Sequence, residues 1–248
     1  MKRPPMSCSL TAAERRRIPV VINNFNRLTM ARELADWLAK AGMQNIIFLD
    51  NASSYPPLLA YYRSCPYRVV SLPTNCGYLA LWESGFHKTF RDSPYLYTDP
   101  DVLPVETCPN DFIDRFFDVL KNYPQYGKVG FGLKLDDLPE HLPSTREVRN
   151  HESEFWRRRV TDTLFDASID TTLALYRPGA IGGHWLRAAR TGGAYVCRHR
   201  PWYLDPNRLD DEERFYRANA RTSTHWTQTL NGQPTASMRA CADVGRLR

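Results

Sequence analysis

The sequence predicts a single α/β domain in which helices flank a mostly parallel central sheet. Through residue 101, short β-branched runs alternate with segments of helical periodicity, and this alternation is typical of parallel strands joined by crossover helices. The predicted strands of this region are followed by Asn, Asp, Ser or Gly. Because parallel strands end at the same edge of a sheet, these polar residues predict a ligand site along that edge.

The first half of the domain alternates predicted strands and helices. In chain order they are strand 18–22, helix 28–38, strand 45–49, helix 56–63, strand 67–72, helix 79–90 and strand 95–98. The strands are β-branched or aromatic, and the first helix has apolar residues at helical spacing before the stop signal Gly42. No glycine-rich phosphate loop follows the first strand, so a nucleotide bound here would depend on side chains and a metal.

The second half is richer in loops. In chain order it contains an amphipathic helix over 111–123, a strand over 128–135, a charged segment over 139–163, a strand within 164–176 and a last long strand over 194–199. Residues 1–17 are polar and basic and predict a mobile tail, whereas the small polar residues 227–248 predict an irregular arm. The domain is therefore expected over 18–226.

Composition and charge limit the classes of partner. The chain has 248 residues, of which 42% are hydrophobic, and its six cysteines form no CxxC pair, so we expect one folded domain with reduced thiols in the cytoplasm. No apolar run approaches the roughly 18 residues of a membrane-spanning helix, so we expect at most peripheral contact with the inner membrane face. The net charge of +6 suits phosphorylated ligands or an anionic surface. Without a zinc-finger spacing, an RNA-recognition signature or a long basic run, we expect no nucleic-acid partner.

Asp99 and Asp101 follow the fourth predicted strand directly. Pro100 between them fixes its own φ and favours an extended conformation at Asp99, so both carboxylates can present oxygens at the strand end. Two hard oxygen ligands suit Mg²⁺ or Mn²⁺, which would also bind phosphate oxygens of a substrate. The alternative interpretation of Asp-Pro-Asp is a solvated turn.

Four short motifs, in order over residues 18–104, resemble those of family-two-type glycosyltransferases. Residues 23–27 (Asn-Asn-Phe-Asn-Arg) resemble the T-Y-N-R step of that family, and residues 50–53 (Asp-Asn-Ala-Ser) resemble its D-N-x-S. Residues 75–78 (Asn-Cys-Gly-Tyr) are similar to its N-x-G step, and residues 99–101 stand at the place of its D-x-D. The resemblance implies a single GT-A-like domain with a Rossmann-like sheet.

This resemblance also implies a function and a set of site residues. A nucleotide-sugar donor, UDP- or GDP-linked, is expected over 18–104, and a glycan or lipid-linked saccharide supplies the acceptor hydroxyl over 105–226. The donor-binding residues that we predict are Asn23, Asn24, Asn26, Arg27, Asp50, Asn51, Asn75, Gly77 and Asp99. Asp99 and Asp101 would hold Mn²⁺ or Mg²⁺ on the donor diphosphate.

His199 ends the last predicted strand, where many GT-A enzymes carry a late histidine as a third metal ligand. We therefore predict His199 as a metal ligand; its alternative role is structural. The adjacent Arg198 and Arg200 can neutralise a diphosphate instead.

An inverting transfer needs a carboxylate that accepts the proton of the acceptor hydroxyl. The candidates are Asp170, Asp166, Glu152 and Asp137. Asp170 precedes an apolar strand, where a rigid element can aim it, and its alternative role is a cap. The E-D step that the family places after such a strand is not visible here, so the base and the stereochemical outcome are left open.

Two other functions fit parts of the sequence. A haloacid-dehalogenase-type phosphatase would use Asp99 as its nucleophile, although that motif normally follows the first strand of the fold and not the fourth. A non-catalytic basic binding module is supported only by the net charge of +6, because the basic residues are scattered.

Overall fold

The structure, a computed structural model, describes residues 9–170, 172–182 and 185–220 of the chain. The strands are β1 (Val20–Asn24), β2 (Ile46–Asp50), β3 (Arg68–Ser71), β4 (Tyr95–Thr98), β5 (Val102–Pro104), β6 (Lys128–Leu133), β7 (Arg159–Thr161), β8 (Leu164–Asp166), β9 (Ala174–Tyr176) and β10 (Ala188–His199). The helices are α1 (Ala12–Arg17), α2 (Thr29–Lys40), α3 (Pro56–Tyr62), α4 (Ala80–Glu83), α5 (Phe112–Asn122), α6 (Thr145–Glu152) and α7 (Asp211–Asn219). Short 3₁₀ segments are η1 (Gly77–Leu79), η2 (Phe86–Phe90), η3 (Ser153–Trp156) and η4 (Arg200–Tyr203).

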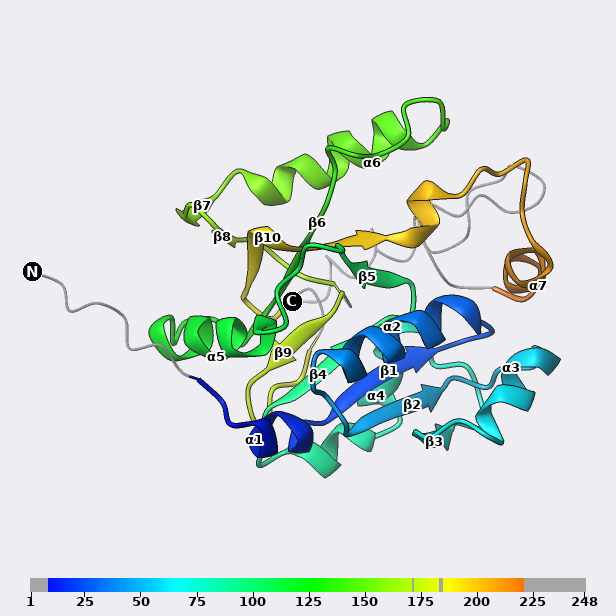
Figure 1. The fold of residues 1–248 in the computed structure, drawn as a ribbon, viewed down its shortest axis with the longest axis horizontal. Coiled ribbons are helices and arrows are strands. Elements are labelled where there is room, and N and C mark those ends of the chain that lie inside the picture. The colour runs from blue at the N-terminus through cyan, green and yellow to red at the C-terminus, as the bar shows by residue number, and fades with distance from the viewer. Residues whose placement is uncertain (1–8, 171, 183–184, 221–248) are drawn as a thin grey trace, which may run out of the picture.

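One mixed sheet joins all the strands. Its order is β3-β2-β1-β4-β9-β6-β10-β8-β7, and β5 pairs with β10 outside this path. The strands β1 to β4 are parallel, and β9 lies antiparallel between β4 and β6, so β6 runs in the direction of β4. The predicted fold class, a single α/β domain around a mostly parallel central sheet flanked by helices, is confirmed. Figure 1 shows the arrowheads of β1, β2 and β10 pointing to one side of the molecule, where α7 lies.

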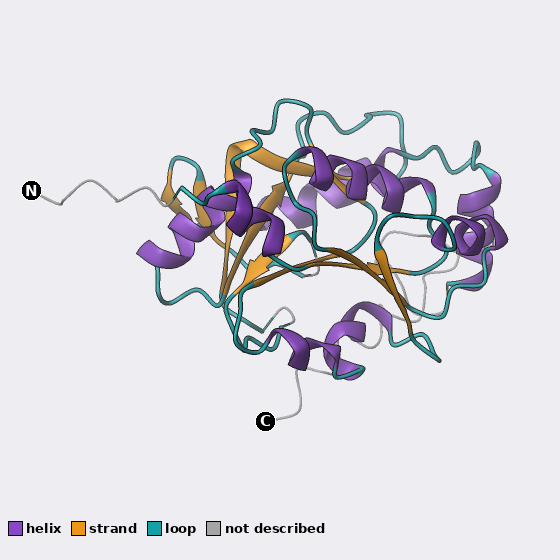
Figure 2. Ribbon diagram, turned by 60° about the horizontal axis from the view of Figure 1, so that its bottom comes forward, coloured by secondary structure: helices purple, strands orange, loops and turns teal. Residues whose placement is uncertain are grey.

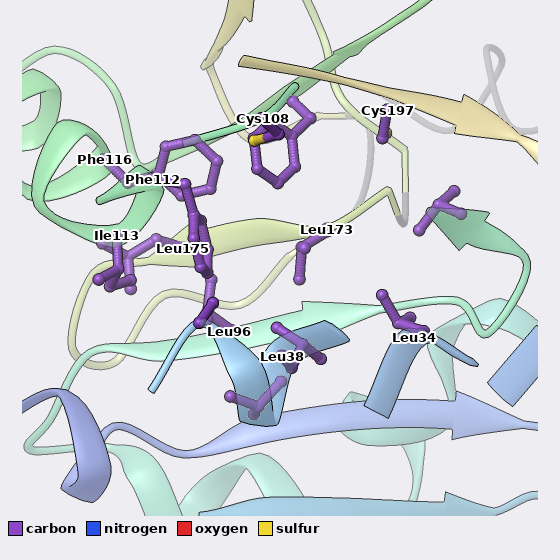
Figure 3. Packing of buried hydrophobic residues seen from close by; sticks show 14 of the residues in the cluster. Leu34, Leu38, Leu96, Cys108, Phe112, Ile113, Phe116, Leu173, Leu175 and Cys197 are labelled. Carbon is purple, nitrogen blue, oxygen red and sulfur yellow. The ribbon is translucent and has the colours of Figure 1, made fainter. Parts of the chain in front are cut away.

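Helices cover both faces of the sheet (Figure 2). Alternate residues of a strand point to opposite faces, so Leu96 of β4 joins the larger core whereas Tyr95 and Tyr97 join the smaller one. Figure 3 shows part of the larger core, in which side chains of α2 and α5 meet those of the strands. The apolar stripe of α2 is fully buried, because its residues recur every three or four positions; it consists of Ala31, Leu34, Ala35 and Leu38.

Residues 9–17 do not form the mobile tail that the sequence predicted. Thr11 and Glu14 form a capping box that starts α1, and this box was a signal the interpretation of a tail overlooked. Arg15 then forms an ion pair with Asp114 of α5, and the amide of Leu10 donates to the same carboxylate at 3.1 Å. Residues 1–8 and the predicted arm 227–248 lie outside the described residues.

Three element boundaries also differ from the prediction. The predicted helix 79–90 is divided into η1, α4 and η2, and the break between α4 and η2 falls at Gly85, which takes a left-handed conformation with φ of 75°. The predicted strand within 164–176 is two strands, β8 and β9, joined by residues 167–173. The last strand begins at Ala188 instead of 194, and its pairing with β6 shifts register between Thr191 and Val196. No helix in the described part of the chain has both the length and the apolar character of a membrane span.

Candidate functional site

Strand pairing brings Asp101 and His199 together. The antiparallel pairing of β5 with β10 sets His199 opposite Val102, directly beside Asp101. The amide of Arg200 donates to the carbonyl of Asp101 at 2.8 Å, which fixes the turn after Pro100 against the end of β10. The imidazole Nε2 of His199 then lies 3.7 Å from Oδ1 of Asp101. Two residues nearly 100 positions apart therefore form one cluster at the carboxyl end of β4 and β10.

The separation of these two atoms fits a shared cation. Two ligand atoms that each lie about 2.1 Å from one ion are roughly 3–4 Å apart. Burial lowers the pKa of His199, partly opposed by Asp101, so the imidazole is neutral near pH 7, which is the form that binds metals. Within the described ranges, no group of three or more His, Cys, Asp or Glu side chains is placed to hold a metal ion. Asp101 and His199 thus supply two ligands for a metal ion, and further ligands would have to come from a substrate or water.

Asp99 lies at the same strand end. Burial raises the pKa of Tyr97 well above its usual value, and the charges of Asp99 and Asp170 raise it further, so both carboxylates lie near the Tyr97 hydroxyl. Asp101, in contrast, lies against His199 and Arg27. The full ligand set of Asp99, Asp101 and His199 stays a prediction.

Arg27 is enclosed beneath α7. Its side chain is 1% exposed, and its Nη1 donates to Oε2 of Glu213 at 2.5 Å. The guanidinium also stacks on the ring of Tyr216, with Cζ 3.7 Å from the ring centroid. Burial opposes the charge, but Tyr216, Asp101 and Glu213 together raise the pKa of Arg27, so it is a buried cation. In this arrangement Arg27 serves to anchor α7 and does not face solvent.

Three of the predicted donor-binding residues fasten the loop after β3 to the strand ends. The side-chain amides of Asn23 and Asn51 donate to the backbone carbonyl of Gly77 at 3.1 and 2.9 Å. Oδ1 of Asn51 accepts from the backbone amide of Cys76 at 2.7 Å, and Oδ1 of Asn75 accepts from the backbone amide of Gly77 at 2.8 Å. Gly77 has a φ of 64°, which an L side chain rarely adopts, and this explains the glycine.

The other predicted asparagines fasten the loop after β2. Oδ1 of Asn26 accepts from the amides of Ser54 and Tyr55 at 2.7 and 2.9 Å, and Asn26 itself takes a left-handed φ of 54° that asparagine tolerates. The amide of Asn24 donates to the carbonyl of Arg27 at 2.8 Å and to the Tyr62 hydroxyl at 2.7 Å. The side chains of Asn24 and Asn26 thus hold the backbone of the strand-end loops in place.

Asp50 is the carboxylate at the end of β2. It is buried, and its burial raises the pKa of its side chain, partly offset by hydrogen bonds from Ser53 and Ser71. The amide of Ser53 donates to Oδ1 of Asp50 at 3.3 Å. Through the parallel pairing of β1 with β2, Asp50 lies opposite Asn24, so the structure does bring these predicted residues to one edge.

The predicted bases occupy different places. Asp170 is exposed and lies four residues before Ala174, which pairs with Tyr97 near the end of β4, so Asp170 belongs to the site edge. Lys128 holds this segment in place, because its Nζ donates to the carbonyls of Ile169 and Asp170 at 2.6 and 3.0 Å.

The remaining candidates are engaged elsewhere. Asp166 pairs with Ala189, next to the amino end of β6, and its carboxylate forms ion pairs with Arg158 and Arg187. It therefore lies at the edge opposite to Asp99.

Glu152 is buried and paired with Arg190 at 2.7 Å, where it fastens α6 to β10. Asp137 accepts hydrogen bonds from Arg198 at 2.7 Å and from the Tyr203 hydroxyl at 2.6 Å, so both of its oxygens are occupied. Arg198 is consequently held at this corner and not at the Asp101–His199 pair.

The sequence interpretation missed two parts of the site. Helix α7 starts at the N-cap Asp210, whose side chain accepts from the amide of Glu213, and this Asp followed by three acidic residues was an available start signal. Lys128 had no such signal, because a lysine at the start of a strand is normally exposed, whereas here it is fully buried.

Taken together, the chain is an α/β protein whose polar cluster lies at the carboxyl edge of a mostly parallel sheet. No protein-family model and no curated protein sequence matches it. Among solved structures it is similar to glucosyl-3-phosphoglycerate synthase from Mycobacterium tuberculosis in complex with phosphoglyceric acid, at a TM-score of 0.43 and 16% identity over 72% of this chain and 63% of that one. Structures of that synthase with Mn²⁺ and UDP-glucose, and with Mn²⁺, UDP and glucosyl-3-phosphoglycerate, have the same TM-score of 0.43 and 16% identity over 68% of this chain. The chain spans 61–63% of the length of these structures.

Proposed function

We propose that the protein is a metal-dependent glycosyltransferase that moves a sugar from a nucleotide-diphosphate sugar to an acceptor hydroxyl. The observation that carries this proposal is the pairing of Asp101 with His199 at 3.7 Å, at the sheet edge where parallel α/β sheets bind ligands. Asp99 and the loops 23–27, 50–54 and 75–78 follow the neighbouring parallel strands β4, β1, β2 and β3 at their carboxyl ends.

Asp101, His199 and Asp99 would hold the cation. When bound, Mn²⁺ or Mg²⁺ supplies Lewis-acid stabilisation of the charge that develops on the leaving diphosphate. The imidazole of His199 favours Mn²⁺ over Mg²⁺, because nitrogen ligands suit the transition metal better. Burial keeps this imidazole neutral, so the protein presents a carboxylate and an uncharged nitrogen in one place.

In this proposal the nucleoside binds over the ends of β1 and β2. Asp50 lies there as a hydrogen-bond acceptor, and the asparagine-fastened loops on either side have their backbone geometry fixed before a ligand arrives. A preformed loop loses less conformational entropy on binding, so these amides contribute to affinity without touching the donor. UDP- and GDP-linked donors remain equal candidates.

Asp170 is our choice for the base. Its carboxylate is exposed near Asp99, and Lys128 fastens the backbone on which it lies. In an inverting transfer Asp170 would accept the proton of the acceptor hydroxyl as the oxygen attacks the sugar. The acceptor that we propose is a glycan or a lipid-linked saccharide, in the cytoplasm or at the inner membrane face.

Isothermal titration with UDP and with GDP, each with and without Mn²⁺, tests this proposal. We expect one of the two nucleotides to bind, more tightly with Mn²⁺. Asp101→Ala should lose the Mn²⁺ dependence and retain the fold, with metal affinity lower by about 10–100-fold.

Two outcomes would reject the proposal. One is sugar transfer at full rate in excess chelator, and the other is nucleotide affinity that is unchanged when Asp50 and Asn51 are both replaced by Ala. Hydrolysis of a small phosphoester that is lost in Asp99→Asn would point to the phosphatase instead.

A further inference from the structure

Helix α7 holds the buried guanidinium of Arg27, which lies next to the candidate metal ligand Asp101. Glu213 of α7 is buried and accepts from Nη1 of Arg27 at 2.5 Å. On the other side of the same guanidinium, Nε of Arg27 lies 3.7 Å from Oδ2 of Asp101. Arg27 thus lies between two carboxylates, one from α7 and one from the site.

The guanidinium is bonded to only one of these carboxylates. Its Nε and Nη2 are buried and have no hydrogen-bond partner, and the 3.7 Å to Asp101 is too long for a hydrogen bond. The ring of Tyr216 packs against the planar guanidinium and keeps it in this position. The hydrogen bond to Glu213 therefore keeps Arg27 closer to Glu213 than to Asp101.

We propose that Glu213 is a positioning residue for the metal site: by holding Arg27 away from Asp101, it leaves the Asp101 carboxylate available to a divalent cation. The inference rests on the proposed function, because it concerns the affinity of the same site for Mn²⁺. It goes beyond that function by assigning a role to a helix that contributes no ligand.

The physical reason is competition for one carboxylate. Arg27 is permanently charged and buried, so it needs an anionic partner in the protein interior. If Glu213 loses its charge, Asp101 is the nearest remaining carboxylate to Arg27 among the described residues. A shift of about 1 Å would then let Nε and Nη2 donate to Asp101 as a fork. The oxygens that would bind Mn²⁺ would be occupied and their charge neutralised.

Glu212 provides a matched contrast on the same helix. Its carboxylate accepts from the amides of Leu28 and Thr29 at 2.9 and 3.0 Å and from the Thr29 hydroxyl at 2.8 Å. It docks α7 on the first turn of α2 and has no bond to Arg27. Loss of its charge therefore disturbs the docking of α7 without releasing the cation.

The experiment is a titration of Mn²⁺ into the full chain in the presence of UDP or GDP, whichever wild type binds, with free Mn²⁺ read by its electron paramagnetic resonance signal. Glu213→Gln should weaken Mn²⁺ binding by about 10–100-fold, whereas Glu212→Gln should stay within about twofold of wild type. Arg217, whose Nε donates to Oε1 of Glu213 at 2.8 Å, keeps an acceptor in the glutamine variant. Thermal unfolding of each variant reports on the fold.

A rescue variant separates competition from damage to the helix. Arg27→Gln alone removes the competing cation and should bind Mn²⁺ at least as tightly as wild type. Combined with Glu213→Gln it should restore the affinity lost in the single variant, because no cation is left to occupy Asp101.

Three results would overturn the inference. Mn²⁺ affinity within about twofold of wild type in Glu213→Gln would show that Arg27 does not compete, and a double variant as weak as Glu213→Gln would show that the loss comes from packing. Glu212→Gln as weak as Glu213→Gln would likewise show that the docking of α7, and not the release of Arg27, sets the affinity. If wild type bound the nucleotide but no Mn²⁺, the proposed metal-dependent function itself would be rejected. If wild type bound Mn²⁺ and Glu213→Gln bound it equally well, only the role of Glu213 would be rejected.

Discussion

At the scale of single residues, the structure separates two of the predicted catalytic bases by their position in the sheet. Asp170 and Asp166 are both acidic residues near strand ends, and the sequence favours Asp170 only because it precedes an apolar strand. The strand register places Asp166 at the amino end of β6, in ion pairs with Arg158 and Arg187. Asp170 lies at the opposite edge, near Asp99.

This difference gives a direct test of the base. Asp170→Asn should lower kcat by about 10²–10⁴-fold, because an amide cannot accept the proton of the acceptor hydroxyl. Mn²⁺ and nucleotide affinities should change little. The control, Asp166→Asn, should keep kcat within a few-fold of wild type, and steady-state kinetics with the identified donor measures both. Equal losses in the two variants would contradict the assignment of Asp170.

Lys128 allows a prediction of pH dependence. Burial lowers the pKa of Lys128 to about 7, although the charge of Asp170 opposes the shift. The unfolded chain then binds more protons than the folded one above that pKa, so the free energy of unfolding should rise with pH from about 7 upward.

Relative to Lys128→Met, the free energy of unfolding of wild type should rise by about 2 kcal/mol between about pH 6 and pH 8.5, as one pKa unit corresponds to about 1.4 kcal/mol. Urea unfolding at the two pH values measures this. The variant serves as the control, because the buried cysteines and tyrosines titrate in the same way in both proteins. A wild-type advantage that is constant or falls with pH would contradict the shifted pKa.

At the scale of elements, two strands account for most of the site geometry. Strand β10 carries His199 to Asp101 through its pairing with β5, and β9 fixes the segment that carries Asp170 between β4 and β6. The close approach of β6 to β9 requires a glycine. A Cβ at Gly130 would lie 2.5 Å from the carbonyl oxygen of Leu173 and 2.7 Å from the Cβ of Ala174.

We expect Gly130→Ala to lower the free energy of unfolding by about 1–3 kcal/mol, since overpacking forces the backbone to move. It should also lower kcat, because the displaced Leu173 lies three residues from Asp170. Gly42→Ala is the control: it has a φ of 91° and no atom within 4 Å of the new Cβ, so it should cost stability through backbone strain and leave kcat unchanged. Chemical denaturation and kinetics of the two variants decide; an unaltered kcat in Gly130→Ala would contradict the link between β9 and the base.

At the scale of the whole molecule, most of the apolar core lies away from the candidate metal site. Val102, which follows Asp101, and Trp202, whose ring centroid lies 4.7 Å from that of His199, belong to the larger core, and most of both cores is formed by residues of other strands and helices. The cation should therefore be needed for transfer and not for folding.

Excess chelator should abolish sugar transfer, and added Mn²⁺ should restore it. The free energy of unfolding should fall only by the amount that ligand linkage predicts, about 3 kcal/mol when the free metal concentration is a hundred times its dissociation constant. Scanning calorimetry with and without chelator measures this. Loss of secondary structure on metal removal would contradict the separation of fold and site.

Sequence alone determined the class of fold and the sheet edge at which the predicted polar residues gather. Periodicity is a local property, so the alternation of strands and helices through β4 was predictable, as was the gathering of polar residues at parallel strand ends. Segments with weak local signals were not: the capping box of α1 was taken for a tail, and the strand predicted within 164–176 is two strands.

Only the tertiary structure decided what each polar residue contacts. The sequence predicted that Asn23, Asn26 and Asn51 would bind a donor, which stays a prediction; that their side chains fasten neighbouring loops is known only from the structure. It gave no sign that Glu213 would reach Arg27 across 186 positions. Such pairings depend on strand order and register, which long-range packing sets, and therefore no local pattern in the chain records them.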